Sequence, residues 1–300
     1  MALVRRADPV DLVLPTTSDE SRAARRGRLR RWLPIAIGLA LAVLMIVVAA
    51  AAPLIAPLSP SAQFSDSVLK GPGVIDRHLL GTDEFGRDVL SRIIWGARVS
   101  LEVGLASVIF AFALGVPLGI VAGVRGGRVE TAIMRGADML MAFPTLLLAL
   151  IIVTALGGTL ANEILAIGVA LTPNFLRLAR SLALTIREQD YILAARAIGS
   201  GQLRVMARHV FPNTLYALVI VATLYIATAI RTEASLSFLG LGIPPPTPSW
   251  GNILSEGRQY IKCCPWITTF SGLAIMVAVL AFNLVGDALR DLLDPRLKGE

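Results

Sequence analysis

The stretch from Asp190 to Asn213 reads DYILAARAIGSGQLRVMARHVFPN, and the interpretation of the whole chain starts from it. It is polar and carries arginines, and it lies between apolar runs long enough to cross a bilayer. Its pattern predicts a helix, a break at Gly199, and a second helix that ends near Pro212. A loop with this much helical pattern indicates a surface to which a soluble partner binds.

The composition is that of a polytopic, all-α membrane protein rather than a soluble enzyme. Of the 300 residues, 55% are hydrophobic and 16% are charged, and the mean hydropathy is +0.70. A soluble domain carries about 25% charged residues. A net charge of +7 does not require a nucleic acid, because the arginines before Trp32 act as an orientation signal beside anionic lipid.

Runs without charge give the candidate spans, since a hydrocarbon core of about 30 Å requires about 20 apolar residues in a helix. Five strong runs cover residues 32–57, 103–124, 139–162, 210–230 and 263–286. A sixth run, 164–176, is too short to span unless the helix also includes the residues before it and the side chains of Arg177 and Arg180 reach the membrane interface.

The distribution of basic residues selects six spans. With a cytoplasmic N-terminus, six spans place 20 of the 28 Lys and Arg residues inside, whereas five spans divide them 14 to 14. Cytoplasmic loops carry the excess of Lys and Arg. The sequence therefore predicts six transmembrane helices with both termini in the cytoplasm. The predicted parts are a basic, disordered cytoplasmic tail at 1–31, a first span at 32–58, an extracytoplasmic segment at 59–98, a membrane core at 99–286 with a cytoplasmic loop at 182–212, and a C-terminal surface helix at 287–300.

The extracytoplasmic segment is expected to contain a separate amphipathic helix that lies in the membrane interface, with Trp95 at the depth of the headgroups. Asp83 is the expected cap of that helix. Its apolar positions at helical spacing are Val89, Leu90, Ile93, Ile94 and Ala97.

Prolines predict irregularities elsewhere in the chain. Pro144 and Pro173 should kink the third and fourth spans, either as packing irregularities or because bent helices surround a pathway. The run from Pro244 to Pro248, followed by Trp250 and a short helix, predicts a rigid external feature.

No catalytic set is evident, and the chain lacks a Gly-Lys phosphate loop. The chain therefore does not hydrolyse ATP itself, and if it works against a gradient, the energy must come from another subunit. A metal site is not expected, because the two histidines, His78 and His209, are far apart in the sequence. Cys263 and Cys264 are adjacent, either as reduced thiols or as a strained vicinal disulfide.

The inner stretch resembles the cytoplasmic EAA loop of binding-protein-dependent ABC importer permeases. That pattern is E-A-A, three residues, Gly, nine residues and I-x-L-P. The residues that match it in register are Ala194, Ala195, Gly199 and Pro212, while Leu193, His209 and Phe211 stand where the pattern has Glu, Ile and Leu. The change at Leu193 removes a carboxylate and puts one polar contact to the ATPase in doubt.

Other motifs resemble the C-type permease subunit of dipeptide and oligopeptide ABC importers. They are LGTDEFGRDVLSRI at 80–93, DMLMAFP at 138–144, EASLSFLGLG at 233–242, PSWG at 248–251 and GDALRDLLDPRL at 286–297. The resemblance implies the type I ABC importer permease fold, in the bacterial cytoplasmic (inner) membrane. It also implies a second, homologous permease, two ATPase subunits that hold ATP and Mg²⁺, and an extracytoplasmic substrate-binding protein. The chain itself is expected to hold no cofactor, and its remaining partner is the lipid bilayer.

The resemblance and the residue pattern together name three sets of candidate site residues. The set that couples to the ATPase is Tyr191, Ala194, Ala195, Arg196, Gly199, Arg204 and Pro212. The pathway candidates are Asp138, Arg231 and Glu233. The candidates for docking the binding protein are Asp83, Arg87, Pro248 and Trp250.

Each charge inside the membrane has a simpler explanation beside the functional one. Asp138 either caps a helix or meets a nearby arginine. Arg231 and Glu233 either form ion pairs or face water, since a buried charge costs about 2.5–3.5 kcal/mol on insertion scales. The functional hypothesis is that Arg231 meets an anionic group of the substrate, such as a peptide carboxylate.

The substrate stays open at this point. Importers of the same architecture also transport nickel chelates, haem, glutathione or oligosaccharides. An ion-coupled secondary transporter would need no docking loop, and an intramembrane enzyme would need a pair of catalytic residues that the sequence does not offer.

Overall fold

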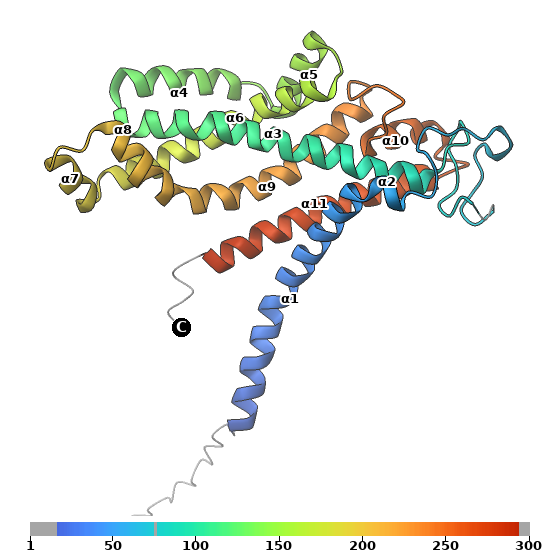
Figure 1. The fold of residues 1–300 in the computed structure, drawn as a ribbon, viewed down its shortest axis with the longest axis horizontal. Helices are drawn as coiled ribbons and strands as arrows, with labels where there is room; N and C mark the ends of the chain where they lie inside the picture. Colours follow the sequence, from blue (N-terminus) through green and yellow to red (C-terminus); the bar gives the residue numbers. More distant parts are fainter. Residues whose placement is uncertain (1–16, 75–76, 294–300) are drawn as a thin grey trace, which may run out of the picture.

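The structure is a computed structural model that describes residues 17–74 and 77–293. Within these ranges the regular elements are helical, and the only β contact is an isolated bridge between Thr82 and Asp88. The long helices form an elongated bundle, with α7 (Asp190–Ala197) and α8 (Gln202–Val205) at one end and α10 (Trp250–Gly257) towards the other (Figure 1). The prediction of an all-α fold is confirmed.

Two parallel helices, α3 (Val89–Arg125) and α6 (Leu160–Arg187), form the centre of the bundle. Glycines at every fourth position of α3 let the backbones approach closely, as is common between membrane helices. A Cβ added at Gly115 would lie 2.7 Å from the carbonyl oxygen of Thr172, and one at Gly123 would lie 2.8 Å from the Cβ of Ala183. The two helices therefore remain in contact over most of their length.

The remaining long helices pack around this pair. They are α9 (Phe211–Phe238), α11 (Trp266–Leu293) and α1 (Thr17–Ala50), and α1 packs against α11 and α3. Large apolar side chains of α1, including Leu39, Leu44 and Ile46, are more than half exposed. This pattern is expected of a helix that faces lipid.

Among residues 17–74 and 77–293, four helices are long and apolar enough to cross a membrane, or five if a bent pair counts as one span. The bent pair consists of α4 (Gly127–Met141) and α5 (Thr145–Leu156). The helix α6 is not among them, but with 28 residues it has the length to span. It contains the weak sixth run of the sequence, so the count of six holds approximately.

The separate interfacial helix predicted before the second span does not exist. Residues 89–125 form one continuous helix of 37 residues, about 55 Å long at 1.5 Å per residue, which exceeds the hydrocarbon thickness. Its first turns stay helical because they pack on α10 rather than on lipid headgroups. Asp88, not Asp83, caps this helix by accepting a hydrogen bond from the backbone nitrogen of Ser91 at 2.7 Å.

The kink predicted at Pro144 needs correction. At Pro144 the chain does not kink within one span; it breaks between α4 and α5 with a bend of 87°. Pro144 is the N-cap of α5, a position that does not need the missing N–H. Pro173, in contrast, lies inside α6 without interrupting it.

The helix that was predicted to end near Pro212 continues. The run from Gln202 to Phe238 is helical throughout, with a π-helical turn at Met206–Val210 (η2). Proline has no N–H and its ring clashes with the carbonyl four residues earlier, so a wider turn before Pro212 relieves the clash. Asn213 Nδ2 donates to the carbonyl of His209 at 2.6 Å, next to this wider turn.

Both predicted terminal segments also differ from expectation. The segment 17–31, predicted to be disordered, belongs to α1, while residues 1–16 lie outside the described part of the chain. The predicted C-terminal surface helix is the end of α11 up to Leu293, and residues 294–300 are likewise not described.

The contact between α3 and α6 can be tested by adding one methyl group. We expect Gly119→Ala to lower the midpoint of thermal unfolding in detergent, by an amount equivalent to about 1–3 kcal/mol, because the neighbouring backbone of α6 leaves no room for a Cβ. The matched control is Gly136→Ala, where a Cβ would meet nothing within 4 Å. That change should be neutral or stabilising, because alanine favours helix over glycine.

Candidate functional site

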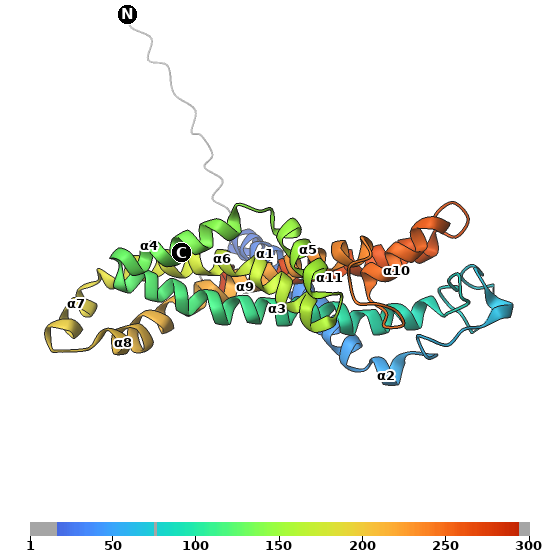
Figure 2. The ribbon, with the colours of Figure 1, turned by 90° about the horizontal axis from the view of Figure 1, so that it is seen from above.

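The inner end of the bundle presents the loop that the sequence analysis singled out. After α6 ends at Arg187, the chain forms α7, turns at Gly199, and enters α8, which continues into α9. Gly199 has a φ of 90°, a conformation that favours glycine. In Figure 2, α7 and α8 lie at one extremity of the molecule, beyond the ends of α3 and α6. We call residues 190–205 the inner loop.

The inner loop is held firmly by the long helices. Ile192, Val205 and Val210 are fully buried and belong to the same apolar core as α3, α6 and α9. At the end of α6, Arg187 donates from Nη1 to the carbonyl oxygen of Gly123 at 2.8 Å, which ties it to the end of α3. The inner loop is therefore packed into the same core as the long helices.

The inner loop exposes large apolar side chains beside charged ones such as Arg196 and Arg204. Four large apolar side chains are exposed there: Tyr191 at 47%, Leu193 at 52%, Ile198 at 85% and Leu203 at 76%. Each exposed apolar Å² costs about 25 cal/mol relative to burial, so a cluster of this kind marks an interface. We call these four residues the apolar cluster.

Most, but not all, of the residues predicted to couple to the ATPase lie on the inner loop with the apolar cluster. Ala194, Arg196, Gly199 and Arg204 are exposed on the inner loop, and Ala195 is half-buried. Pro212 is exposed but lies beyond the π-helical turn, in the first turn of α9. Leu193 extends the cluster where the family pattern has a carboxylate, so this position favours apolar contact in the present chain. Leu203 was missed because it lies outside the pattern.

Asp138 forms an ion pair with an arginine, which was one of the two simple roles considered for it from the sequence. Its Oδ1 accepts from Arg177 Nη2 at 2.6 Å, between α4 and α6, and both side chains are about half exposed. A second pair, Glu130 with Arg180, lies between the same two helices. These two pairs fasten α4 alongside α6.

Arg231 and Glu233 do not pair with each other and have different surroundings. Arg231 is exposed, and its Nη2 lies 3.3 Å from Thr228 Oγ1. It borders an opening of about 500 Å³ lined mainly by apolar side chains, among them Leu146 and Phe238. Glu233 is fully buried, and its Oε1 accepts from Ser237 Oγ at 3.0 Å. Glu233 therefore does not line an open pathway in this conformation.

At the outer end, a network of buried charges joins the turn before α3 to α10. Asp83 Oδ2 accepts from Arg87 Nε at 2.6 Å and from Arg92 Nη1 at 2.5 Å. Glu256 Oε2 accepts from the same two guanidinium groups at 2.8 and 2.6 Å. Burial raises the pKa of the neighbouring Glu84. We call Asp83, Arg87, Arg92 and Glu256 the outer charge network.

The outer charge network explains why its acidic residues are not a metal centre. Carboxylate oxygens of Asp83, Glu84 and Glu256 lie within 4.8 Å of one another, a spacing that a cation could use. However, Arg87 and Arg92 already bind Asp83 and Glu256 and supply two positive charges. A divalent ion would have to displace both.

The four residues predicted to dock a binding protein are buried, so that prediction is wrong for their side chains. Asp83 and Arg87 belong to the outer charge network, and Pro248 lies beneath the surface. Trp250 is 1% exposed, and its Nε1 donates to the carbonyl of Ile93 at 3.0 Å. These residues hold the outer end together. The exposed part of the same segment is residues 244–247.

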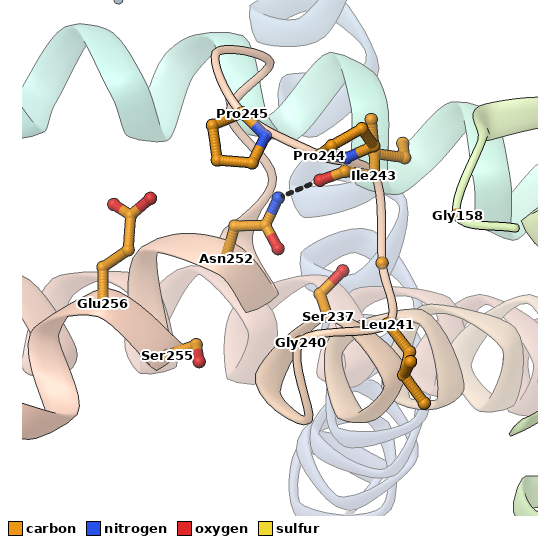
Figure 3. A pocket seen from close by; sticks show the side chains of 11 residues that line it. Gly158, Ser237, Gly240, Leu241, Ile243, Pro244, Pro245, Asn252, Ser255 and Glu256 are labelled. Atoms are coloured by element: carbon orange, nitrogen blue, oxygen red, sulfur yellow. Dashed lines mark hydrogen bonds between the residues drawn. The ribbon is translucent and has the colours of Figure 1, made fainter. Parts of the chain in front are cut away.

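A pocket of about 390 Å³ opens beside that exposed segment. Figure 3 shows its lining, where Asn252 Nδ2 donates to the carbonyl of Ile243 at 2.7 Å. The pocket joins the end of α9, the loop after it, α10 and the turn before α6. Its lining residues are Gly158, Ser237, Gly240, Leu241, Gly242, Ile243, Pro244, Pro245, Asn252, Ser255 and Glu256.

The adjacent cysteines are free thiols. Cys263 is exposed and Cys264 is buried, with their Sγ atoms 2.9 Å apart. Burial raises the pKa of the Cys264 thiol to about 11, so this thiol is protonated and unreactive near neutral pH. The structure therefore has Cys263 and Cys264 as reduced thiols rather than as a vicinal disulfide.

Comparison with known proteins supports one family. Residues 115–299 match the family described as "Binding-protein-dependent transport system inner membrane component". The chain is 46% identical to the "Di/tripeptide transport system permease protein DppC" of Pseudomonas aeruginosa, over 87% of this chain and 88% of that protein. It is 46% identical to the "Dipeptide transport system permease protein DppC" of Escherichia coli K12, over 87% and 89% of the two chains. A "Putative peptide transport system permease protein" of Brucella abortus is 43% identical over 98% of both.

The fold also matches a solved transporter. A structure described as inward-facing conformations of the MetNI methionine ABC transporter superposes with a TM-score of 0.56 and 19% identity, covering 67% of this chain and 96% of that chain. A second crystal form gives a TM-score of 0.55 at 21% identity. At this identity the likeness concerns the fold alone.

The outer charge network should contribute far more to stability than the exposed pairs. We expect Asp83→Asn to lower the free energy of unfolding by about 3–5 kcal/mol, because it leaves two buried arginines, Arg87 and Arg92, to share the single charge of Glu256. Asp138→Asn, which breaks an exposed pair with Arg177, should cost about 0–1 kcal/mol. Chemical unfolding in detergent micelles measures both; equal losses would contradict this assignment.

Proposed function

Because this chain belongs to the family of binding-protein-dependent transport system inner membrane components, we propose that it forms the translocation pathway of an ATP-driven importer for di- and oligopeptides. It is a multi-pass permease subunit of the inner membrane. Peptides are the substrate that the names of its relatives give. Those relatives match almost the whole chain, which favours peptides over nickel chelates, haem or glutathione.

The observation that carries the proposal is the apolar cluster on the inner loop. An apolar surface in water is stabilised by a partner, and here the cluster lies on helices whose other faces are buried against α3 and α9. Since the chain has no phosphate loop of its own, that partner is an ATPase subunit that binds ATP and Mg²⁺. Closure of two such subunits would push the inner loop and tilt the bundle.

A second, homologous permease completes the pathway in this proposal. Arg231 is the residue of the chain best suited to meet the substrate, because its charge is exposed beside an apolar opening large enough for a small side chain. A peptide carries both an apolar side chain and a terminal carboxylate. Arg231 would recognise the carboxylate, since guanidinium pairs with carboxylate in a bidentate manner.

The binding protein is proposed to dock at the opposite end from the inner loop. The exposed segment 244–247 and the adjoining pocket offer a protruding edge and a hollow, in place of the four buried residues named from the sequence. With the N-terminus in the cytoplasm, this end faces the extracytoplasmic space.

Transport in a reconstituted system tests the function. The assembled permease pair, ATPases and binding protein should take up a labelled dipeptide into proteoliposomes only when ATP is present. We expect Leu203→Asp to reduce that uptake by at least about tenfold, because a charge in an apolar interface must be desolvated. Val129→Asp, which changes an exposed apolar residue of α4 that is not part of the inner loop, is the matched control and should transport normally. Uptake without nucleotide would overturn the proposal.

The role of Arg231 needs a separate measurement. We expect Arg231→Leu to reduce the preference of the transporter for a free peptide over its C-terminally amidated form, by roughly tenfold, because a charge-assisted hydrogen bond contributes about 1.5–3 kcal/mol. Arg98→Leu removes another exposed arginine, on α3, and should leave the preference unchanged. Competition between the two peptides in the uptake assay gives the ratio directly. An unaltered ratio in the Arg231 variant removes this residue from the recognition site.

A further inference from the structure

Two carboxylates are buried in the bundle and have no role in the function proposed above. Glu163 lies in the first turn of α6 and Glu233 lies in α9, and both have no exposed surface. Among the described residues, neither forms an ion pair with a lysine, arginine or histidine. They are close enough for their charges to repel each other.

Three of their four carboxylate oxygens lack any hydrogen-bond partner in the part of the chain that the structure describes. These are both oxygens of Glu163 and Oε2 of Glu233. An isolated carboxylate in an apolar interior is among the most costly groups to bury, and a neighbouring like charge raises that cost. Such a pair is stable only when positive charge reaches it.

The protein does not supply that positive charge from the helices packed around the pair. The helix α5 has no charged residue, and Arg92 of α3 is bound to Glu256 of α10. The other charged residues on the adjoining parts of α3 and α9 are exposed, and the arginines of α6 lie towards its inner end, where they pair with α4 or with the end of α3. These residues are Arg98, Glu102, Arg231, Arg177, Arg180 and Arg187.

A route for a proton leads from the outer pocket to the pair. Ser237 lines the pocket, as Figure 3 shows, and its hydroxyl donates to Glu233 Oε1 at 3.0 Å. The hydroxyl of Ser249 lies 3.4 Å from that of Ser237. A hydroxyl both donates and accepts hydrogen bonds, so it can receive a proton on one side and release another on the other.

We propose that Glu163 and Glu233 form a proton-binding site that is loaded from the outer pocket through the hydroxyl of Ser237. A hydronium ion in the pocket transfers its proton to Ser237 Oγ, which passes its own proton to Glu233 Oε1 and is restored. One carboxylate becomes a neutral carboxylic acid, and one water molecule stays in the pocket.

The site goes beyond the proposed import function, which takes its energy from ATP. It lies where α6 and α9 meet beneath the outer end, so a rearrangement that separates these helices would expose the pair to water and release the proton. Extracytoplasmic pH would thereby act on the outward-open state. This consequence does not depend on which substrate is transported.

Infrared spectroscopy of the assembled transporter in lipid nanodiscs tests the site, because a protonated carboxyl has a carbonyl band distinct from that of a carboxylate. At pH 7, where exposed glutamates are ionised, we expect the wild-type protein to show such a band. Glu163→Gln or Glu233→Gln should diminish or abolish it, whereas Glu102→Gln, a change at an exposed position of α3, should leave it intact. Basal ATPase activity of each assembled variant shows that it has folded.

Two further experiments ask whether the site binds a metal cation instead of a proton, and whether the proton passes through Ser237. If sodium or potassium at fixed pH removes the band, the pair is a metal-cation site and the proposal fails. If no band is present, or if both glutamine variants retain it in full, the proposal also fails. Ser237→Ala should slow the appearance of the band after a step to lower pH without changing its final size. An unchanged rate would exclude the Ser237 route.

Discussion

The close contact between α3 and α6 is the constraint on which the rest of the structure depends. Backbones that approach at Gly115, Gly119 and Gly123 leave no freedom for one helix to move without the other. Because the two helices are parallel, they carry the outer charge network at one end and the inner loop at the other. Interfaces of this kind adopt discrete arrangements rather than deforming continuously, so force at one end moves the bundle as a rigid body.

Charge is distributed along this rigid core according to what surrounds it. At the outer end, Arg87 and Arg92 are buried and fully compensated, which fixes α10 on α3. At the inner end, the Asp138–Arg177 pair between α4 and α6 is about half exposed and contributes little to stability, while the Glu130–Arg180 pair between the same helices is partly buried. The charges that join elements at the outer end are thus more deeply buried than those between α4 and α6.

The buried carboxylates are the exception to this distribution, since Glu163 and Glu233 are neither compensated nor exposed. Nothing in the packing of the bundle requires them, because apolar residues of similar size would fill the same space at lower cost. Their position between α6 and α9, beneath the pocket that contains Ser237, connects them to the outer surface. A group that costs stability and adds no packing is most simply explained by function.

The sequence by itself determined the helical class, the approximate number of spans, the family and the existence of the inner loop, because hydrophobic length and local motifs are properties of short segments. Tertiary structure alone decided the rest. No local signal shows that α3 stays helical for 37 residues, since contact with α10 causes it. The burial of Asp83 and Trp250, the separation of Arg231 from Glu233, and the meeting of Glu163 with Glu233 all arise from residues far apart in the chain. Their environments depend on which helices pack together, and short segments do not encode that.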